Sequence, residues 1–308
     1  MLGMLLAAAT LLLTGLPLVV VGTTLVLALY KVIPMSLAAW AADPVVFQYT
    51  FFLFAHNLME AMALMVASAT YATLPLYLAD GSRKLYSEKL ANLALWILLV
   101  TSVTSGLHHF ITFYPNQPAA LSYWGNIMSW GTGMGAAISI FTILATIWQH
   151  GLKAEPGIVA VLVGWALYIL DGASAIVTSN IAWTYQLHGT MWQSGHFMTV
   201  VLSMSLMWMG VLYHHYPVLT GRKLDPALGY LYVKLISVGS LGAAIVMLAG
   251  GAAGMPRRFA DWHPEGWMLY GNLILAFGLI IGASFAVYFY NLMKSREISA
   301  PMGELARA

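Results

Sequence analysis

The sequence has no cysteine and very few charged residues, and both absences limit what the protein can be. Without cysteine, disulfides, thiolate zinc sites and the usual iron–sulfur clusters are excluded, so a bound metal must be held by histidine, carboxylate or methionine. Only 8% of the 308 residues are charged, whereas a soluble domain carries about 25%. With 60% apolar residues, the composition is typical of a protein whose solvent is the lipid bilayer. The net charge of +2 is too small to indicate nucleic acid as a partner.

Eight apolar stretches are long enough to cross a bilayer, since one helical span needs about 20 residues. Their connections are short, and no internal repeat or low-complexity segment separates them. We therefore predict an all-α integral membrane protein in which residues 1–308 form a single transmembrane helical domain. The predicted spans cover approximately residues 3–30, 48–79, 88–112, 126–149, 156–180, 191–217, 229–251 and 267–293.

The distribution of lysine and arginine predicts the orientation in the membrane. The loops on one side carry most of these residues, and the opposite loops hold only Lys31, Arg257 and Arg258. Positively charged loops stay inside, so both termini are expected on the cytoplasmic face of the cytoplasmic membrane. The residues on the predicted inner side are Arg83, Lys84, Lys89, Lys153, Arg222, Lys223, Lys294, Arg296 and Arg307.

Four histidines from three predicted spans lie at similar depth in the outer third of the bilayer. His56 belongs to the second span, the adjacent His108 and His109 to the third, and His196 to the sixth. Imidazole in hydrocarbon is costly unless it is paired or bound to metal, and its neutral nitrogen is a ligand for copper, iron or zinc. The matched depth therefore predicts a metal site. Glu60, one turn after His56 on the same helix face, is a further candidate.

Other interpretations of these histidines stay open on this reasoning. Each could be an interior group bonded to a backbone carbonyl, and two at one depth could hold a low-spin b-type haem between two helices. The second interpretation explains two histidines but not the adjacent pair. Another adjacent pair, His214 and His215, falls at the inner end of the sixth span and is interpreted as interfacial.

Around these histidines the chain resembles subunit I of the haem-copper oxidase superfamily, which includes cytochrome oxidases and nitric oxide reductases. The row DPVVFQYTFFLFAH, residues 43–56, is similar to the start of the family's sixth helix. SGLHHF, residues 105–110, resembles the segment with two adjacent ligands of the non-haem metal. LHGTMWQSGHFMTVVLS, residues 187–203, resembles the tenth-helix region, and GMPRRFADW, residues 254–262, resembles the segment with an arginine pair.

The resemblance implies which residues bind metal and haem iron. His56, His108 and His109 would hold the non-haem metal, which is iron or copper, and His196 would bind the iron of a high-spin haem. The two centres would face each other across a small apolar pocket. In nitric oxide reductases a glutamate lies beside the non-haem iron, so Glu60 is a further candidate ligand.

The resemblance also implies which residues hold the haem carboxylates. His188 would lie beside a haem propionate, and Arg257 and Arg258 would bind the propionates. Two haem carboxylates would explain why these arginines stand on the predicted outer side. The alternative is an ordinary surface pair.

The resemblance covers nearly the whole chain but only the last eight of the family's twelve helices. The first span, with LLLTGLPLVVVGTTL at residues 11–25, resembles the fifth helix. The chain is thus either a C-terminal part of a subunit I-like catalytic chain or works with a second chain that supplies the first four helices. The resemblance implies an electron-donor subunit as well, linked to cytochrome c or quinol.

Two residues depart from the pattern or have no assigned role. Met198 stands where the family has a histidine that binds the low-spin haem. A second haem shared with a partner chain through Met198 is one interpretation, and simple packing of this side chain is the other. Asp171 lies within the fifth span, where a carboxylate is a functional candidate, but the sequence assigns it no role.

The residue at position 60 decides the predicted substrate. Most dioxygen-reducing members have a tyrosine there, and C-type members have it on the next helix, where this chain has Ser102. A carboxylate is typical of nitric oxide reductases and suits iron better than copper. We therefore predict a membrane-bound respiratory terminal oxidoreductase that reduces a diatomic gas, with nitric oxide slightly favoured and Glu60 catalytic. Glu60 could alternatively be a proton-pathway or pairing residue.

Two other functions remain open. The first is a cytochrome oxidase subunit I-type dioxygen reductase that works with a partner chain. The second is a non-catalytic haem-binding sensor or a degenerate subunit.

Overall fold

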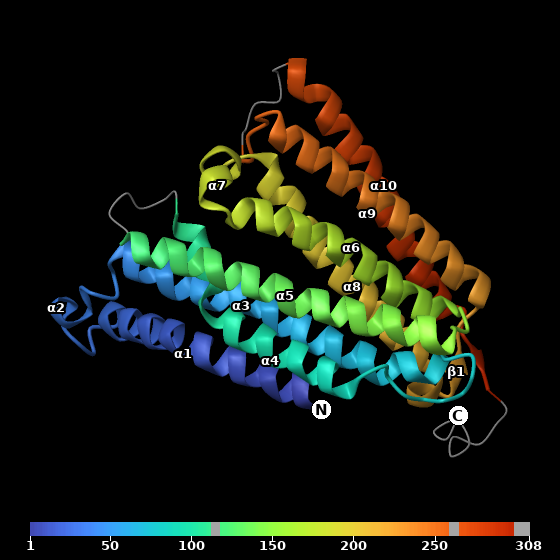
Figure 1. Cartoon of the computed structure of the whole chain (residues 1–308). Coiled ribbons are helices and arrows are strands. Elements are labelled where there is room, and N and C mark those ends of the chain that lie inside the picture. The colour runs from blue at the N-terminus through green and yellow to red at the C-terminus, as the bar shows by residue number, and fades with distance from the viewer. Residues whose placement is uncertain (112–117, 259–264, 299–308) are drawn as a thin grey trace. The chain divides into compact units, whose positions relative to one another are not determined.

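A computed structural model of the chain describes residues 1–111, 118–258 and 265–298, and these residues are almost entirely helical (Figure 1). Eight helices in these ranges are long and apolar enough to cross a membrane. The predicted all-α membrane fold is therefore confirmed. These helices are α1 (Leu2–Leu29), α3 (Pro44–Thr73) continued by η1 (Leu74–Tyr77), α4 (Glu88–Ser105) continued by η2 (Gly106–Phe110), α5 (Ala119–His150), α6 (Pro156–Ser179), α8 (Met191–Thr220), α9 (Pro226–Ala252) and α10 (Glu265–Met293).

Side chains and backbone geometry explain several helix ends. Ser87 accepts a hydrogen bond from the Leu90 amide at the start of α4, and Thr190 caps α8 in the same way. Asp225 caps α9, whose first residue is a proline. Both are favoured arrangements at helix N-termini. Gly221 ends α8 with a φ of 68°, a conformation that glycine adopts without steric cost.

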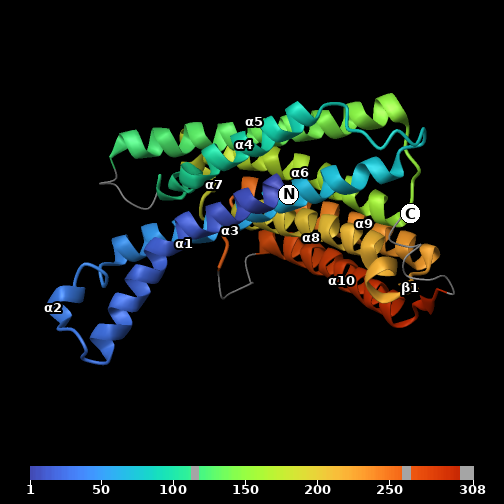
Figure 2. The ribbon, with the colours of Figure 1, turned by 90° about the horizontal axis from the view of Figure 1, so that it is seen from below.

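Four short elements connect or follow the long helices. They are α2 (Met35–Ala38), α7 (Ile181–Leu187), β1 (Arg222–Lys223) and β2 (Arg296–Glu297). Figure 2 shows α2 in the connection between α1 and α3. The two strands pair in antiparallel fashion, with Arg222 opposite Glu297, and the guanidinium of Arg222 also binds Ser295. These contacts attach the end of α10 to the end of α8.

The chain divides into two compact units. Unit 1 consists of residues 1–68, 87–142 and 179–181, and unit 2 of residues 69–86, 143–178 and 182–308. The assignment of residues 1–308 to one domain stays a prediction, as does the cytoplasmic location of the termini. Arg307, the end of the third predicted span at residue 112, and residues 259–262 of the arginine segment lie outside the described residues.

Unit 2 is held together by close packing of its helices. α6 and α8 approach so closely that a Cβ atom at Gly210 would lie 2.5 Å from the main-chain oxygen of Gly157. Small residues at such crossings are the usual means of helix association in membranes. α9 packs against both α8 and α10, and it runs beside α10 in both views (Figures 1 and 2). Leu206, Tyr232 and Ile236 are buried in the resulting core.

Unit 1 combines α1, α2, most of α3, α4 with η2, and the first part of α5. Asn57 links α3 to α4, because its amide donates to the carbonyls of Leu53 and Val103 at 2.7 and 3.2 Å. Thr101 and Thr132 form a 3.1 Å hydrogen bond between α4 and α5. These polar contacts between helices position the middle of α3, which carries His56, and the end of α4, which leads into the two histidines of η2.

Candidate metal centre

Three of the predicted histidines come together in unit 1. His56 from α3 and His108 and His109 from η2 each offer one ring nitrogen, and these nitrogens lie within 4.8 Å of one another. Nδ1 of His56 is 3.2 Å from Nε2 of His109. Two nitrogens bound to one tetrahedral metal at about 2.0 Å would be about 3.3 Å apart. The donor set and its spacing therefore fit a transition-metal ion.

Glycine residues allow this close approach. α4 tightens into the 3-10 helix η2 at Gly106, where a Cβ atom would lie 3.2 Å from Cβ of His56. On the other side, a Cβ atom at Gly125 of α5 would lie 2.5 Å from the amide nitrogen of His108. The segment with the adjacent histidines thus lies directly between α3 and α5.

Two serines determine which nitrogen of each ring is protonated. The Ser105 hydroxyl lies 2.8 Å from Nε2 of His56 and donates its own proton to the Ser102 carbonyl. The Ser129 hydroxyl lies 2.7 Å from Nδ1 of His108 and donates to the Gly125 carbonyl. Each serine oxygen therefore accepts a hydrogen bond from the imidazole N–H. In these tautomers a metal would bind Nδ1 of His56, which lies 3.2 Å from Nε2 of His109, and Nε2 of His108.

Glu60 lies beside the three-histidine group without being part of it. Its Oε1 is 3.5 Å from Nε2 of His56, the nitrogen that faces Ser105, and its side chain is 13% exposed. Its Oε2 is buried and has no hydrogen-bond partner among the described residues. Its assignments as metal ligand and catalytic residue stay predictions, and the geometry favours contact with His56.

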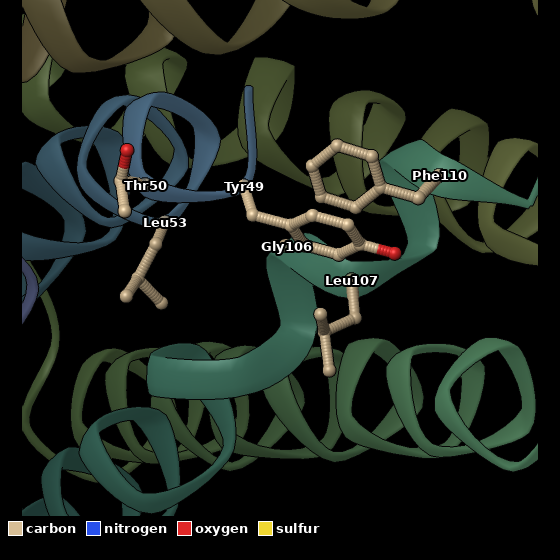
Figure 3. A pocket seen from close by; sticks show the side chains of 6 residues that line it. All are labelled: Tyr49, Thr50, Leu53, Gly106, Leu107 and Phe110. Carbon is tan, nitrogen blue, oxygen red and sulfur yellow. The ribbon is translucent and has the colours of Figure 1, made fainter. Parts of the chain in front are cut away.

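An apolar pocket of about 140 Å³ is lined in part by Gly106 and Leu107, which directly precede His108 in η2 (Figure 3). The ring of Tyr49 stacks on Phe110 with centroids 4.2 Å apart, and the ring of Phe52 stacks on His109 at 5.0 Å. The pocket is large enough for small apolar molecules. Its lining residues are Tyr49, Thr50, Leu53, Gly106, Leu107 and Phe110.

His196 lies in unit 2, where two side chains of α6 face its ring. Oδ1 of Asp171 is 2.8 Å from Nδ1 of His196, and the Ser174 hydroxyl is 3.3 Å from the same nitrogen. Asp171 is buried and His196 is partly exposed. The sequence left Asp171 without a role, and the structure places it against the predicted haem ligand.

The structure also brings the His188 segment and the arginine segment together. Backbone hydrogen bonds join Arg257 to Gly189 at 2.9 Å and Met191 to Met255 at 2.8 Å. Burial lowers the pKa of His188 from 6.5 to about 4, and the positive charges of Arg257 and Arg258 add to this effect. The ring is therefore neutral near pH 7, and the role of His188, Arg257 and Arg258 in binding haem carboxylates stays a prediction.

The other three residues singled out from the sequence take no part in either site. Met198 packs against the apolar core of unit 2, which favours the packing interpretation. His214 is half-buried, with its Nδ1 2.7 Å from the hydroxyl of Tyr77, while His215 is exposed.

Comparisons with known proteins agree with the helical architecture. Cytochrome c oxidase polypeptide 1 of Halobacterium salinarum is 24% identical over 254 residues, which are 82% of this chain and 42% of the relative. Cytochrome c oxidase subunit 1 of Thermus thermophilus is 27% identical over 291 residues, which are 85% of this chain and 50% of the relative. The chain thus spans about half the length of the curated relatives it matches.

A solved structure shows the same fold. A heme-copper terminal oxidase dimer, determined by cryo-electron microscopy, superimposes with a TM-score of 0.79 at 21% identity. The match covers 96% of this chain and 57% of that chain. Residues 1–281 match the protein family described as Cytochrome C and Quinol oxidase polypeptide I. With this match over most of its length, the chain belongs to that family.

Proposed function

We propose that this chain carries the metal and haem ligands of a membrane-bound respiratory terminal oxidase that reduces a diatomic gas. The observation that carries this proposal is the group of His56, His108 and His109, whose ring nitrogens lie within 4.8 Å of one another and two of whose rings are oriented by serine hydroxyls. A structural role would not require three imidazoles to converge in this way. Family membership supports the proposal, because it makes an oxidoreductase the expected class of protein.

In this proposal the three histidines hold a non-haem metal, and His196 binds a high-spin haem. Nδ1 of His56 and Nε2 of His108 and His109 supply the metal-binding lone pairs. The haem and the metal would supply electrons and open coordination positions to the bound gas. The chain's own residues orient the ligands, exclude water around the apolar pocket and bind the haem carboxylates.

The carboxylate-binding site consists of the His188 and arginine segments. Arg257 and Arg258 would neutralise two propionates, since guanidinium groups form strong charge-assisted hydrogen bonds with carboxylates. His188 is neutral near pH 7 and can donate or accept a hydrogen bond beside them. The backbone hydrogen bond between Arg257 and Gly189 supports this assignment by joining the two segments.

Dioxygen is the substrate that we propose first. The relatives with the matching helices are named cytochrome c oxidases, and copper is a natural metal for three imidazole ligands. The comparisons give no specific support to the initial preference for nitric oxide. Nitric oxide remains the second candidate because position 60 is glutamate and position 102 is serine, so neither holds the tyrosine of dioxygen-reducing members.

The proposed complex contains the equivalent of the family's first four helices and an electron-donor subunit linked to cytochrome c or quinol. A second haem would be bound mainly outside the described helices, because Met198 packs in the core of unit 2. The complex would reside in the cytoplasmic membrane.

The proposal is tested by metal analysis and an optical spectrum of the purified protein, co-expressed with the chains encoded beside its gene. We expect one high-spin haem and one copper ion per chain. Non-haem iron in place of copper would favour nitric oxide, and haem without a second metal would contradict the proposal.

The variant His109→Ala sharpens this test, because it should lose the second metal and retain the haem. His215→Ala is the matched control, since this histidine is exposed and lies outside the three-histidine group. Loss of the metal in both variants would indicate a general effect on folding.

A further inference from the structure

Asp171 of α6 and His196 of α8 lie against each other in unit 2, with Oδ1 and Nδ1 2.8 Å apart. The carboxylate is only 4% exposed. Buried carboxylates inside membrane spans are costly and are usually functional. The close approach to one ring nitrogen of His196 therefore points to a specific role for Asp171.

The contacts of Ser174 indicate which nitrogen of the His196 ring is protonated. Ser174 lies three residues after Asp171, so both side chains share one face of α6. Its hydroxyl donates to the main-chain oxygen of Asp171 at 2.8 Å, which leaves the serine oxygen to accept from Nδ1 of His196 at 3.3 Å. With the serine oxygen as acceptor the proton lies on Nδ1, so Nε2 keeps the lone pair that binds a metal, and Oδ1 of Asp171 lies 2.8 Å from the protonated nitrogen.

We propose that Asp171 is a positioning residue that holds His196 in this tautomer and makes its ring a stronger electron donor. This inference rests on the proposed function, in which His196 binds haem iron. A carboxylate near the outer nitrogen raises the basicity of a metal-bound imidazole and fixes its orientation. A more electron-rich ligand stabilises ferric over ferrous iron, so Asp171 lowers the reduction potential of this haem.

The test is a redox titration and a resonance Raman measurement of the ferrous iron–histidine stretching frequency. Both use the haem-loaded chain with its partner subunits. In Asp171→Asn the ratio of reduced to oxidised haem at a fixed potential should rise at least tenfold, a shift of at least about 59 mV. The stretching frequency should fall, and Asp171→Glu should restore both values towards the wild type.

Ser203→Ala is the matched control, because this buried serine lies on the same helix as His196 and donates its hydroxyl proton within its own turn, to the Val200 carbonyl. It should change neither quantity. An unchanged potential and frequency in Asp171→Asn would overturn the proposal and reduce Asp171 to a packing role.

Ser174→Ala gives a second test if Asp171→Asn does not fold. This variant removes the serine acceptor and keeps the carboxylate. The ratio of reduced to oxidised haem at a fixed potential should therefore stay within twofold of the wild-type ratio. A tenfold rise in this ratio would overturn the proposal, because Ser174 and not Asp171 would then control the reduction potential of the haem. Absence of a high-spin haem from the wild-type complex would overturn the proposed function itself and this inference with it.

Discussion

Nδ1 of His56 and Nε2 of His109 lie 3.2 Å apart, although 53 residues separate them in the chain. This distance is close to that expected for two ligands of one tetrahedral metal. The arrangement depends on Gly106, whose lack of a side chain lets η2 lie against His56. Substitutions that change the hydrogen bonds or the packing around this pair should therefore alter metal binding.

Ser129→Ala should weaken metal binding by about tenfold to 100-fold, the usual effect of removing a hydrogen-bond partner of a ligating histidine. The reason is that the Ser129 hydroxyl fixes Nδ1 of His108 as the protonated nitrogen. The measurement is metal retention during dialysis against a chelator. Ser139→Ala on the same helix is the control, since its hydroxyl bonds the Gly135 carbonyl one turn back. Equal retention in the two variants would contradict the assigned tautomer.

Gly125→Ala should lower the free energy of unfolding by about 1–3 kcal/mol, the usual cost of overpacking. The added methyl group would lie 2.5 Å from the amide nitrogen of His108 and would displace η2. Thermal unfolding in detergent measures the loss, and metal content should fall with it. Gly278→Ala in α10 is the control, because nothing lies within 4 Å of its added Cβ atom. That variant should be neutral or gain up to about 1 kcal/mol.

Glu60→Gln should keep the metal and lower the rate of gas reduction by about 10²–10⁴, the usual contribution of a general acid or base. The carboxylate faces the outer nitrogen of His56 and not the centre of the three-histidine group, so it is better placed to transfer protons than to bind the metal. Turnover and metal content are measured on the same preparation. Loss of the metal along with activity would instead make Glu60 a ligand.

Acidification should destabilise the haem-free protein through His188. The pKa of this ring is about 4 in the folded chain and 6.5 when unfolded, so between these values only the unfolded chain binds a proton. The free energy of unfolding therefore falls as the pH is lowered through this range. Because the ring is only partly buried, solvent screening reduces the effect to about 1–2 kcal/mol.

The unfolding temperatures at pH 7 and pH 5 measure this effect. In His188→Gln the difference between the two temperatures should shrink by the contribution of His188. If the difference stays as large in His188→Gln as in the wild type, the loss of stability at low pH comes from other groups.

The apolar runs alone were enough to predict the helices and the class of protein. Spans longer than about 20 apolar residues have few alternatives to a membrane helix, because backbone groups in lipid must bond within the segment. The position of His56, His108 and His109 along their helices also follows from the sequence, since depth depends only on the distance from a span's end. The sequence therefore predicted that the three histidines lie at a common depth in the bilayer.

The tertiary structure alone decided which faces of the helices meet. Hydropathy does not specify how a helix that is apolar all round is rotated about its axis, so Ser105, Ser129 and Asp171 could not be matched to their histidines from the sequence. Glu60 shows the same limit: its spacing placed it on the face of His56, but only the structure shows that it faces Nε2, the nitrogen that also faces Ser105 of α4. Contacts between distant segments depend on side-chain packing at helix crossings, which no local pattern records.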